Sequence, residues 1–123
     1  MRTIRIAAEK PQKYGAKRCA WNGIQFARHA ELARYLQLLE MQKRGEIYGV
    51  ELQPVYVLAP AVRILGEARK RPALRYVADF RYFKAPGLAV VEDVKGLDTP
   101  ASRIKRHLMA TVHGIHVVLI KKS

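Results

Sequence analysis

The longest run of apolar and β-branched positions covers residues 73–95, and it predicts a β-hairpin. The first strand is expected over residues 74–83 and the second over residues 88–95. Between them, Lys84-Ala85-Pro86-Gly87 has the composition of a turn. Charged residues interrupt the apolar pattern of this hairpin, and the three acids and the lysine among them are the ones that a core strand normally avoids. They are Asp79, Glu92, Asp93 and Lys95.

Apolar positions at helical spacing predict two helices on either side of this hairpin. Leu32, Leu36 and Leu39 form one line within a helix expected over residues 24–44, which Gly45 would end. Residues 101–112 form the second predicted helix, with Asp98 or Thr99 as its cap and Pro100 in its first turn. Further strands are expected over residues 46–58, with a bend or an edge at Pro54, and over residues 115–120.

The predicted elements therefore follow the order α-β-β-β-α-β. This order indicates the α/β class, with a mixed central sheet flanked by helices. A chain of 123 residues is long enough for one core, so we expect a single domain over residues 19–123. Residues 1–18 are rich in basic residues and show little apolar period, which predicts an extended basic arm.

The net charge of the chain indicates what kind of partner the protein binds. The formal net charge is +13, with 23 Lys and Arg against 10 Asp and Glu. Such an excess favours a polyanionic partner, nucleic acid first and an anionic membrane surface second. No stretch approaches the roughly 20 apolar residues that span a bilayer, and the first 20 residues lack the apolar centre of a signal peptide. Cys19 is the single cysteine, which excludes a disulfide framework and fits a cytoplasmic protein.

Basic residues gather in two segments that lie outside the predicted core. The N-terminal arm and the connector over residues 59–72 are both expected to contact a phosphate backbone. The candidate nucleic-acid-binding residues are Lys13, Lys17, Arg18, Arg69, Lys70 and Arg71.

The acidic residues of the hairpin form a candidate catalytic cluster. Side chains alternate along a strand, so Asp93 and Lys95 share one face, and pairing of the two strands can bring Asp79 beside them. Two carboxylates and a lysine suit a divalent metal ion and a phosphate. The alternative is an ordinary ion pair between Asp93 and Lys95 on an exposed strand.

Glu31 is the unusual position of the first predicted helix. It lies on or beside the apolar stripe, where a carboxylate costs desolvation unless a cation or a metal ion compensates it. A metal ion is one interpretation. An intrahelical pair with Arg28 or Arg34, each three residues away, is the other.

Glu31 in the first helix, Asp79, and Asp93-Val94-Lys95 before a helix and a strand resemble the PD-(D/E)xK nuclease superfamily, which has the restriction-endonuclease-like fold. Across nearly the whole chain, the amino-acid sequence also resembles a family of small phage and prophage proteins of unknown function that have been likened to Holliday-junction resolvases. Ala78 stands where the superfamily name has proline. The segments that carry this second resemblance are Lys13-Tyr14-Gly15, Phe26, Glu51-Leu52-Gln53-Pro54, residues 76–80 and Glu92-Asp93-Val94-Lys95-Gly96.

The resemblance implies a Mg²⁺- or Mn²⁺-dependent DNA endonuclease in a bacterial host cell, acting on double-stranded or branched DNA. Asp79, Asp93 and Glu31 would bind the metal ion, and Lys95 would orient the attacking water and stabilise the transition state. Gln53 would position the substrate and Lys105 would contact phosphate. Cutting a symmetric junction needs two active sites, so a homodimer is also implied.

Two other functions stay open from the residues alone. One is a non-catalytic nucleic-acid-binding protein built on a nuclease-like scaffold. The other is a basic structural or assembly protein, which would give no reason for Glu31, Asp79, Asp93 and Lys95 to occur in this arrangement.

Overall fold

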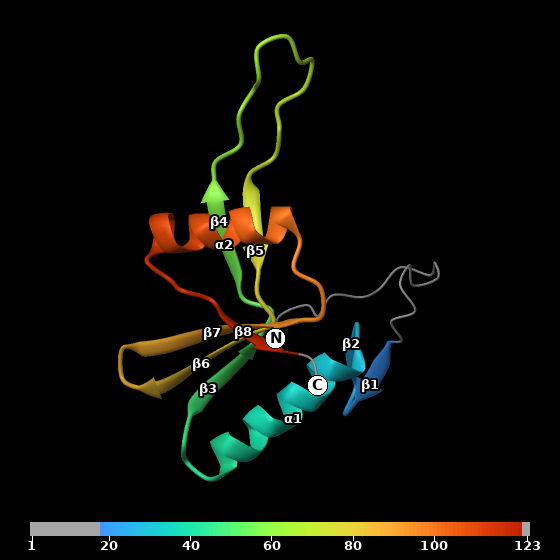
Figure 1. Ribbon diagram of the computed structural model, residues 1–123, viewed down its shortest axis with the longest axis vertical. Helices are drawn as coiled ribbons and strands as arrows, with labels where there is room; N and C mark the ends of the chain where they lie inside the picture. The colour runs from blue at the N-terminus through green and yellow to red at the C-terminus, as the bar shows by residue number, and fades with distance from the viewer. Residues whose placement is uncertain (1–17, 122–123) are drawn as a thin grey trace.

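The computed structural model describes residues 18–121 as a mixed α/β protein with two helices and three sheets (Figure 1). No helix in this part of the chain is long and apolar enough to cross a membrane. The strands are β1 (Cys19–Trp21), β2 (Ile24–Phe26), β3 (Tyr48–Leu52), β4 (Val55–Ala59), β5 (Leu74–Val77), β6 (Phe80–Ala85), β7 (Leu88–Lys95) and β8 (Val118–Lys121), and the helices are α1 (His29–Lys43) and α2 (Pro100–His113).

The main sheet has four strands in the order β3-β6-β7-β8. β3, β6 and β7 pair antiparallel, and β8 pairs parallel with β7 after the chain has crossed over through α2. The mixed sheet and the flanking helices predicted from the sequence are therefore confirmed. β1–β2 and β4–β5 form separate two-stranded sheets, and α2 lies across β4 and β5 (Figure 1).

Strand β7 separates two apolar clusters. Val94 belongs to the cluster that includes Leu38 of α1, whereas Val91 belongs to the cluster that includes Met109 of α2. Because side chains alternate along a strand, Asp93 shares the face of Val91, and Glu92 shares the face of Val94. The two neighbouring acids of β7 thus serve different sides of the sheet.

The helix ends follow the local sequence signals. The Thr99 hydroxyl accepts a hydrogen bond from the Ser102 amide (3.1 Å), and Pro100 follows as the first residue of α2. Gly114 ends α2 with φ +68°, a left-handed conformation that glycine adopts without strain. Arg44 caps the C-terminus of α1, and Gly45 follows it, as predicted.

The first helix begins later than predicted. Residues 24–26 were expected to be helical, but they form β2, which pairs with β1 across a turn at Asn22 and Gly23. Both turn residues have positive φ (51° and 79°), as a tight hairpin of this kind requires. The alternation of half-buried Ile24, exposed Gln25 and buried Phe26 is that of a strand.

The strand predicted over residues 74–83 is broken in two, and this is the second correction. β5 leaves the hairpin to pair with β4, while β6 keeps the predicted pairing with β7. Residues 46–58 form two strands, β3 and β4, on either side of Pro54, where the sequence predicts a bend or an edge. The observed order is therefore longer than α-β-β-β-α-β. The last strand begins at Val118, three residues beyond the predicted start.

Candidate functional site

The candidate site lies where the ladder between β6 and β7 opens. Its last pair is Phe80 with Glu92, and beyond it β7 continues to Lys95 with β8 on one side only. On the open side no strand pairs with the backbone of Val94, and side chains bind it instead. Its N–H donates to Asp79 Oδ2 (2.7 Å), and its carbonyl accepts from Arg28 Nη2 (2.9 Å). The opening thus places a carboxylate where a strand would otherwise pair.

Asp79 occupies the two-residue link between β5 and β6, where the chain passes from one sheet to the other. The corresponding link between β3 and β4 lies against it. The backbone N–H of Gln53 donates to the Asp79 carbonyl (2.9 Å), and the backbone N–H of Ala78 donates to the Pro54 carbonyl (3.1 Å). Gln53 is buried and has φ +51°, a left-handed conformation that is uncommon for glutamine. The predicted positioning residue Gln53 therefore holds Asp79 through its backbone.

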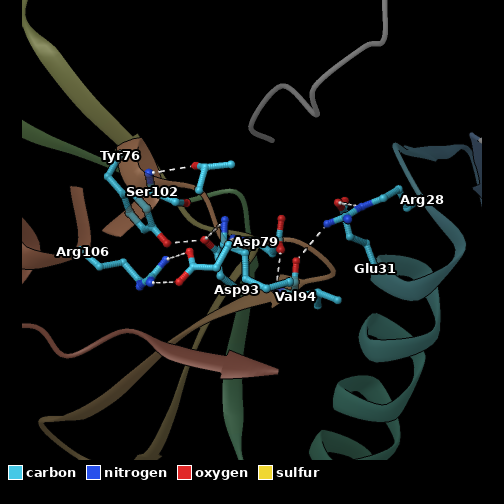
Figure 2. A network of polar contacts seen from close by, with 11 residues as sticks. Arg28, Glu31, Tyr76, Asp79, Asp93, Val94, Ser102 and Arg106 are labelled. Atoms are coloured by element: carbon cyan, nitrogen blue, oxygen red, sulfur yellow. Dashed lines mark hydrogen bonds and ion pairs between the residues drawn. The ribbon is translucent and has the colours of Figure 1, made fainter. Parts of the chain in front are cut away.

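Asp93 is bound to Asp79 and to two further groups (Figure 2). Its Oδ1 accepts the Asp79 amide (2.9 Å), and its Oδ2 accepts the Tyr76 hydroxyl and lies 3.3 Å from Lys95 Nζ. Both aspartates are buried, with 7 % of Asp79 and 4 % of Asp93 exposed. The structure therefore brings Asp79, Asp93 and Lys95 together, and the ion pair between Asp93 and Lys95 forms inside the site.

Tyr76 holds Asp93 as a hydrogen-bond donor. Burial raises the pKa of its phenol far above the usual value, and the hydrogen bond to Asp93 raises it further. The phenol therefore keeps its proton, and Asp93 remains an acceptor. Arg106 of α2 lies near this pair and binds Asp98 through both Nη atoms (2.9 and 2.7 Å), which raises the pKa of Arg106 (Figure 2).

Glu31 reaches the site only through Arg28. The carboxylate is buried, and its Oε2 lies 3.4 Å from Arg28 Nε, while Nη2 of the same guanidinium binds the Val94 carbonyl. The intrahelical pair that the sequence left open is thus present. Within residues 18–121, no group of three or more His, Cys, Asp or Glu side chains is placed to hold a metal ion. Glu31 does not join the two aspartates as a third acid.

The donor atoms of the site are nevertheless those of a hard cation. Asp79 and Asp93 supply carboxylate oxygens, the Val94 carbonyl lies between them and Glu31, and Mg²⁺ and Mn²⁺ bind oxygen ligands of this kind. The Arg28 guanidinium bridges the Val94 carbonyl and Glu31, so these two oxygens already face one cation. The two aspartates therefore supply oxygen donors of the type that a divalent ion binds, while Arg28 occupies the Val94 carbonyl and Glu31.

Glu92 belongs to a separate network on the α1 side of β7. It is 1 % exposed, binds Arg34 Nε and Nη2 (2.9 and 2.6 Å), and accepts the Tyr82 hydroxyl. The strand alternation predicted that Glu92 would face away from Asp93, and the structure confirms it. Burial and the hydrogen bond to Glu92 raise the pKa of Tyr82 to about 12.

The raised pKa of Tyr82 predicts a loss of stability at high pH. An unfolded tyrosine loses its proton near pH 10, so the contribution of the folded phenol is complete below pH 10 and is lost as the pH rises to about 12. The free energy of unfolding of the wild type, minus that of Tyr82→Phe, should fall between pH 9 and pH 12. A difference that stays constant over this range would contradict the assignment.

The predicted basic residues lie in different parts of the chain. Lys13 and Lys17 lie outside the described residues, as does most of the predicted basic arm, and Arg18 is exposed directly before β1. Arg69, Lys70 and Arg71 lie in the segment that connects β4 to β5 and projects beyond α2 (Figure 1). Lys105 is half-buried on α2.

Sequence reasoning did not assign Tyr76, Arg28, Arg34 or Arg106 to a site. Arg28 was considered only as a partner for Glu31, and its contact with Val94 spans 66 positions of the chain. Tyr76 lies three residues before Asp79, and its position in an aromatic strand with a buried carboxylate nearby is the one local signal that could have indicated it.

Comparison with known proteins identifies the family of the chain. A family described as "Protein of unknown function (DUF1064)" matches residues 11–122, which is nearly the whole chain. No curated protein and no solved structure matches the chain. The chain therefore belongs to the DUF1064 family of proteins of unknown function.

Proposed function

We propose that this protein is a metal-dependent DNA endonuclease with a restriction-endonuclease-like core. The observation that carries the proposal is the pair of buried aspartates at the open end of the β6–β7 ladder. Asp93 accepts the backbone N–H of Asp79 and forms an ion pair with Lys95, and Asp79 accepts the backbone N–H of Val94. Two buried carboxylates side by side repel each other, and each costs desolvation. A divalent cation would relieve both, which gives this arrangement a function that a simple ion pair lacks.

The remaining residues of the site have roles that follow from their contacts. Asp79 and Asp93 would hold Mg²⁺ or Mn²⁺, which would polarise the scissile phosphate and lower the pKa of a bound water. Tyr76 keeps the Asp93 carboxylate in place by donating to Oδ2. Lys95, half-buried and 3.3 Å from the same oxygen, would orient the water and stabilise charge on the phosphate.

The charge of the chain supports DNA as the substrate. A net charge of +13 provides the cations that bind a polyanion. A phosphodiesterase needs only a few carboxylates, which would bind the metal ion. Double-stranded or branched DNA is the proposed substrate class, and a homodimer would supply two active sites for a symmetric junction.

A second function has one observation in its favour. Glu31 is paired with Arg28, and no third acid accompanies the two aspartates in the described chain. A non-catalytic DNA-binding protein on a nuclease-like scaffold would have these properties. It would bind DNA in a salt-sensitive manner and would not cut it, whichever metal ion is present.

Replacing Lys95 tests the first function against the second. We expect Lys95→Met to lower the cleavage rate about 10²- to 10³-fold, which is the usual cost of removing one charge-stabilising donor. DNA binding should change little. Lys84→Met is the matched control, because Lys84 is exposed on β6 near the opposite end of the hairpin. Single-turnover cleavage of a labelled duplex measures both variants, and equal rates for Lys95→Met and the wild type would contradict the assigned role.

A further inference from the structure

The segment between β4 and β5 projects from the protein (Figure 1). We call residues 60–73 the extension. All of them are exposed except Glu67 and Ala73, which are half-buried. The extension passes beyond α2 and away from the main sheet, so it does not contribute to either apolar cluster.

Hydrogen bonds hold the extension in one conformation. Val62 and Arg71 form a β-bridge, with N–H to carbonyl distances of 3.0 and 2.6 Å. At the tip, the Glu67 amide donates to the Ile64 carbonyl (3.0 Å), and Gly66 has the positive φ (89°) that this turn needs. The Arg63 guanidinium binds the carbonyls of Glu67 and Ala68 from inside the loop (3.3 and 2.9 Å). These hydrogen bonds therefore fix the conformation of the tip.

The residue at the outermost turn is apolar. Leu65 is 100 % exposed, and its neighbours Ile64 and Val62 are 42 % and 48 % exposed. A single exposed leucine is unremarkable in a protein. Here, however, Leu65 and the adjacent Ile64 lie on a turn that hydrogen bonds hold, Val62 lies in the β-bridge of the same extension, and none of the three covers an apolar cluster. This arrangement favours a partner that offers an apolar surface at one point.

The flanks of the extension are basic. Arg71 binds Glu67 through two nitrogens (2.9 and 2.6 Å), and Arg63 binds the loop backbone, so these two cations hold the extension itself. Arg69 and Lys70 are exposed, and neither forms an ion pair with any residue that the structure describes. They remain able to bind phosphate groups.

We propose that the extension is a DNA-contacting hairpin in which Arg69 and Lys70 bind the phosphate backbone and Leu65 inserts between bases where their stacking is interrupted. Two-stranded ribbons fit the major groove, and apolar side chains act as wedges between base steps in other DNA-binding proteins. A step that is already unstacked, such as a branch point, costs least to open. The part played in cleavage rests on the proposed nuclease function, but the contact itself does not.

The length of the extension limits where a cut could fall. Leu65 precedes Asp79 by 14 positions, which extended strands would span in at most about 46 Å. Successive nucleotides of one strand rise about 3.4 Å along a duplex. The cut should therefore lie no more than about 13 nucleotides from the base step that Leu65 opens.

The test measures binding in EDTA, so that it does not depend on cleavage. The probe is a four-way junction with 2-aminopurine beside the branch point, and a linear duplex with the same base is its partner. We expect the full-length wild type to raise 2-aminopurine fluorescence in the junction. Leu65→Ser should remove most of this rise and weaken junction binding about tenfold, because the serine side chain no longer buries apolar surface in the opened base step. Its duplex affinity should change little.

Two further variants complete the test. The double variant Arg69→Ser/Lys70→Ser should weaken binding to both DNAs and lower the salt slope by about two. Leu88→Ser is the matched control, because Leu88 is an exposed leucine (55 %) at the β6–β7 turn, and it should behave as wild type. Thermal unfolding checks that each variant is folded.

The outcomes separate this inference from the nuclease proposal. A wild type that binds neither DNA at low salt, or a Leu65→Ser variant that matches the wild type in affinity and fluorescence, overturns the inference even if metal-dependent cleavage is observed. The expected fluorescence result without cleavage in any metal supports the extension and contradicts the nuclease.

Discussion

Asp93→Asn should abolish cleavage and leave the protein able to bind DNA. The amide keeps the shape of the carboxylate and can still accept from the Asp79 amide, but it loses the charge that would bind a divalent cation. A loss of about 5 kcal/mol of transition-state stabilisation corresponds to a rate reduction of roughly 10³- to 10⁴-fold. Single-turnover cleavage measures the rate, and filter binding in EDTA measures the affinity.

Two comparisons make this result specific to the site. Glu40→Gln removes a negative charge from the exposed face of α1 and should cut DNA at the wild-type rate. Asp79→Asn should lose cleavage to a similar degree as Asp93→Asn, since the two aspartates would hold the same ion. Cleavage by Asp93→Asn within tenfold of the wild type would contradict the assignment of Asp93 as a metal ligand.

Glu92→Ala should destabilise the fold by about 3–5 kcal/mol, the usual cost of removing one partner from a buried ion pair. The change leaves Arg34 facing the sheet without its carboxylate and the Tyr82 hydroxyl without its acceptor. Urea unfolding at pH 7 measures the effect. Cleavage at a temperature where the variant remains folded should be retained, because Glu92 points to the opposite side of the sheet from Asp93.

The control for Glu92→Ala is a substitution in a solvent-exposed ion pair of the same protein. Glu46→Ala breaks the exposed pair with Arg44 and should change stability little. Adding Arg34→Ala to Glu92→Ala should recover part of the loss, because it removes the unpaired cation. A destabilisation below 1 kcal/mol for Glu92→Ala would show that this network does not hold α1 to the sheet.

Local signals predicted the parts of the fold that local chemistry decides. Pro86 and Gly87 mark the β6–β7 turn, Thr99 and Pro100 begin α2, and Gly45 follows the end of α1. Strand alternation was sufficient to separate the faces of Glu92 and Asp93. These features depend on residues a few positions apart, where spacing and turn chemistry determine the conformation.

The parts that the sequence did not predict depend on distant partners. Residues 74–83 are rich in aromatic and apolar residues throughout, and the break at Asp79 arises because Val77 pairs with Val55 while Phe80 pairs with Leu52 and Glu92. Pairings of this kind leave no local mark. The role of Arg28 could not be read for the same reason, since a choice between Glu31 and a distant carbonyl depends on how α1 packs against β7.

The measurement that tests the central claim most directly is cleavage of a labelled four-way junction and a matched linear duplex by the wild-type protein in Mg²⁺, in Mn²⁺ and in EDTA. The account predicts cutting with either metal ion and no cutting in EDTA. The ratio of junction to duplex cleavage would then define the preferred substrate. Tight binding to both DNAs without cutting in any of the three conditions would contradict the nuclease and favour a DNA-binding protein on the same scaffold.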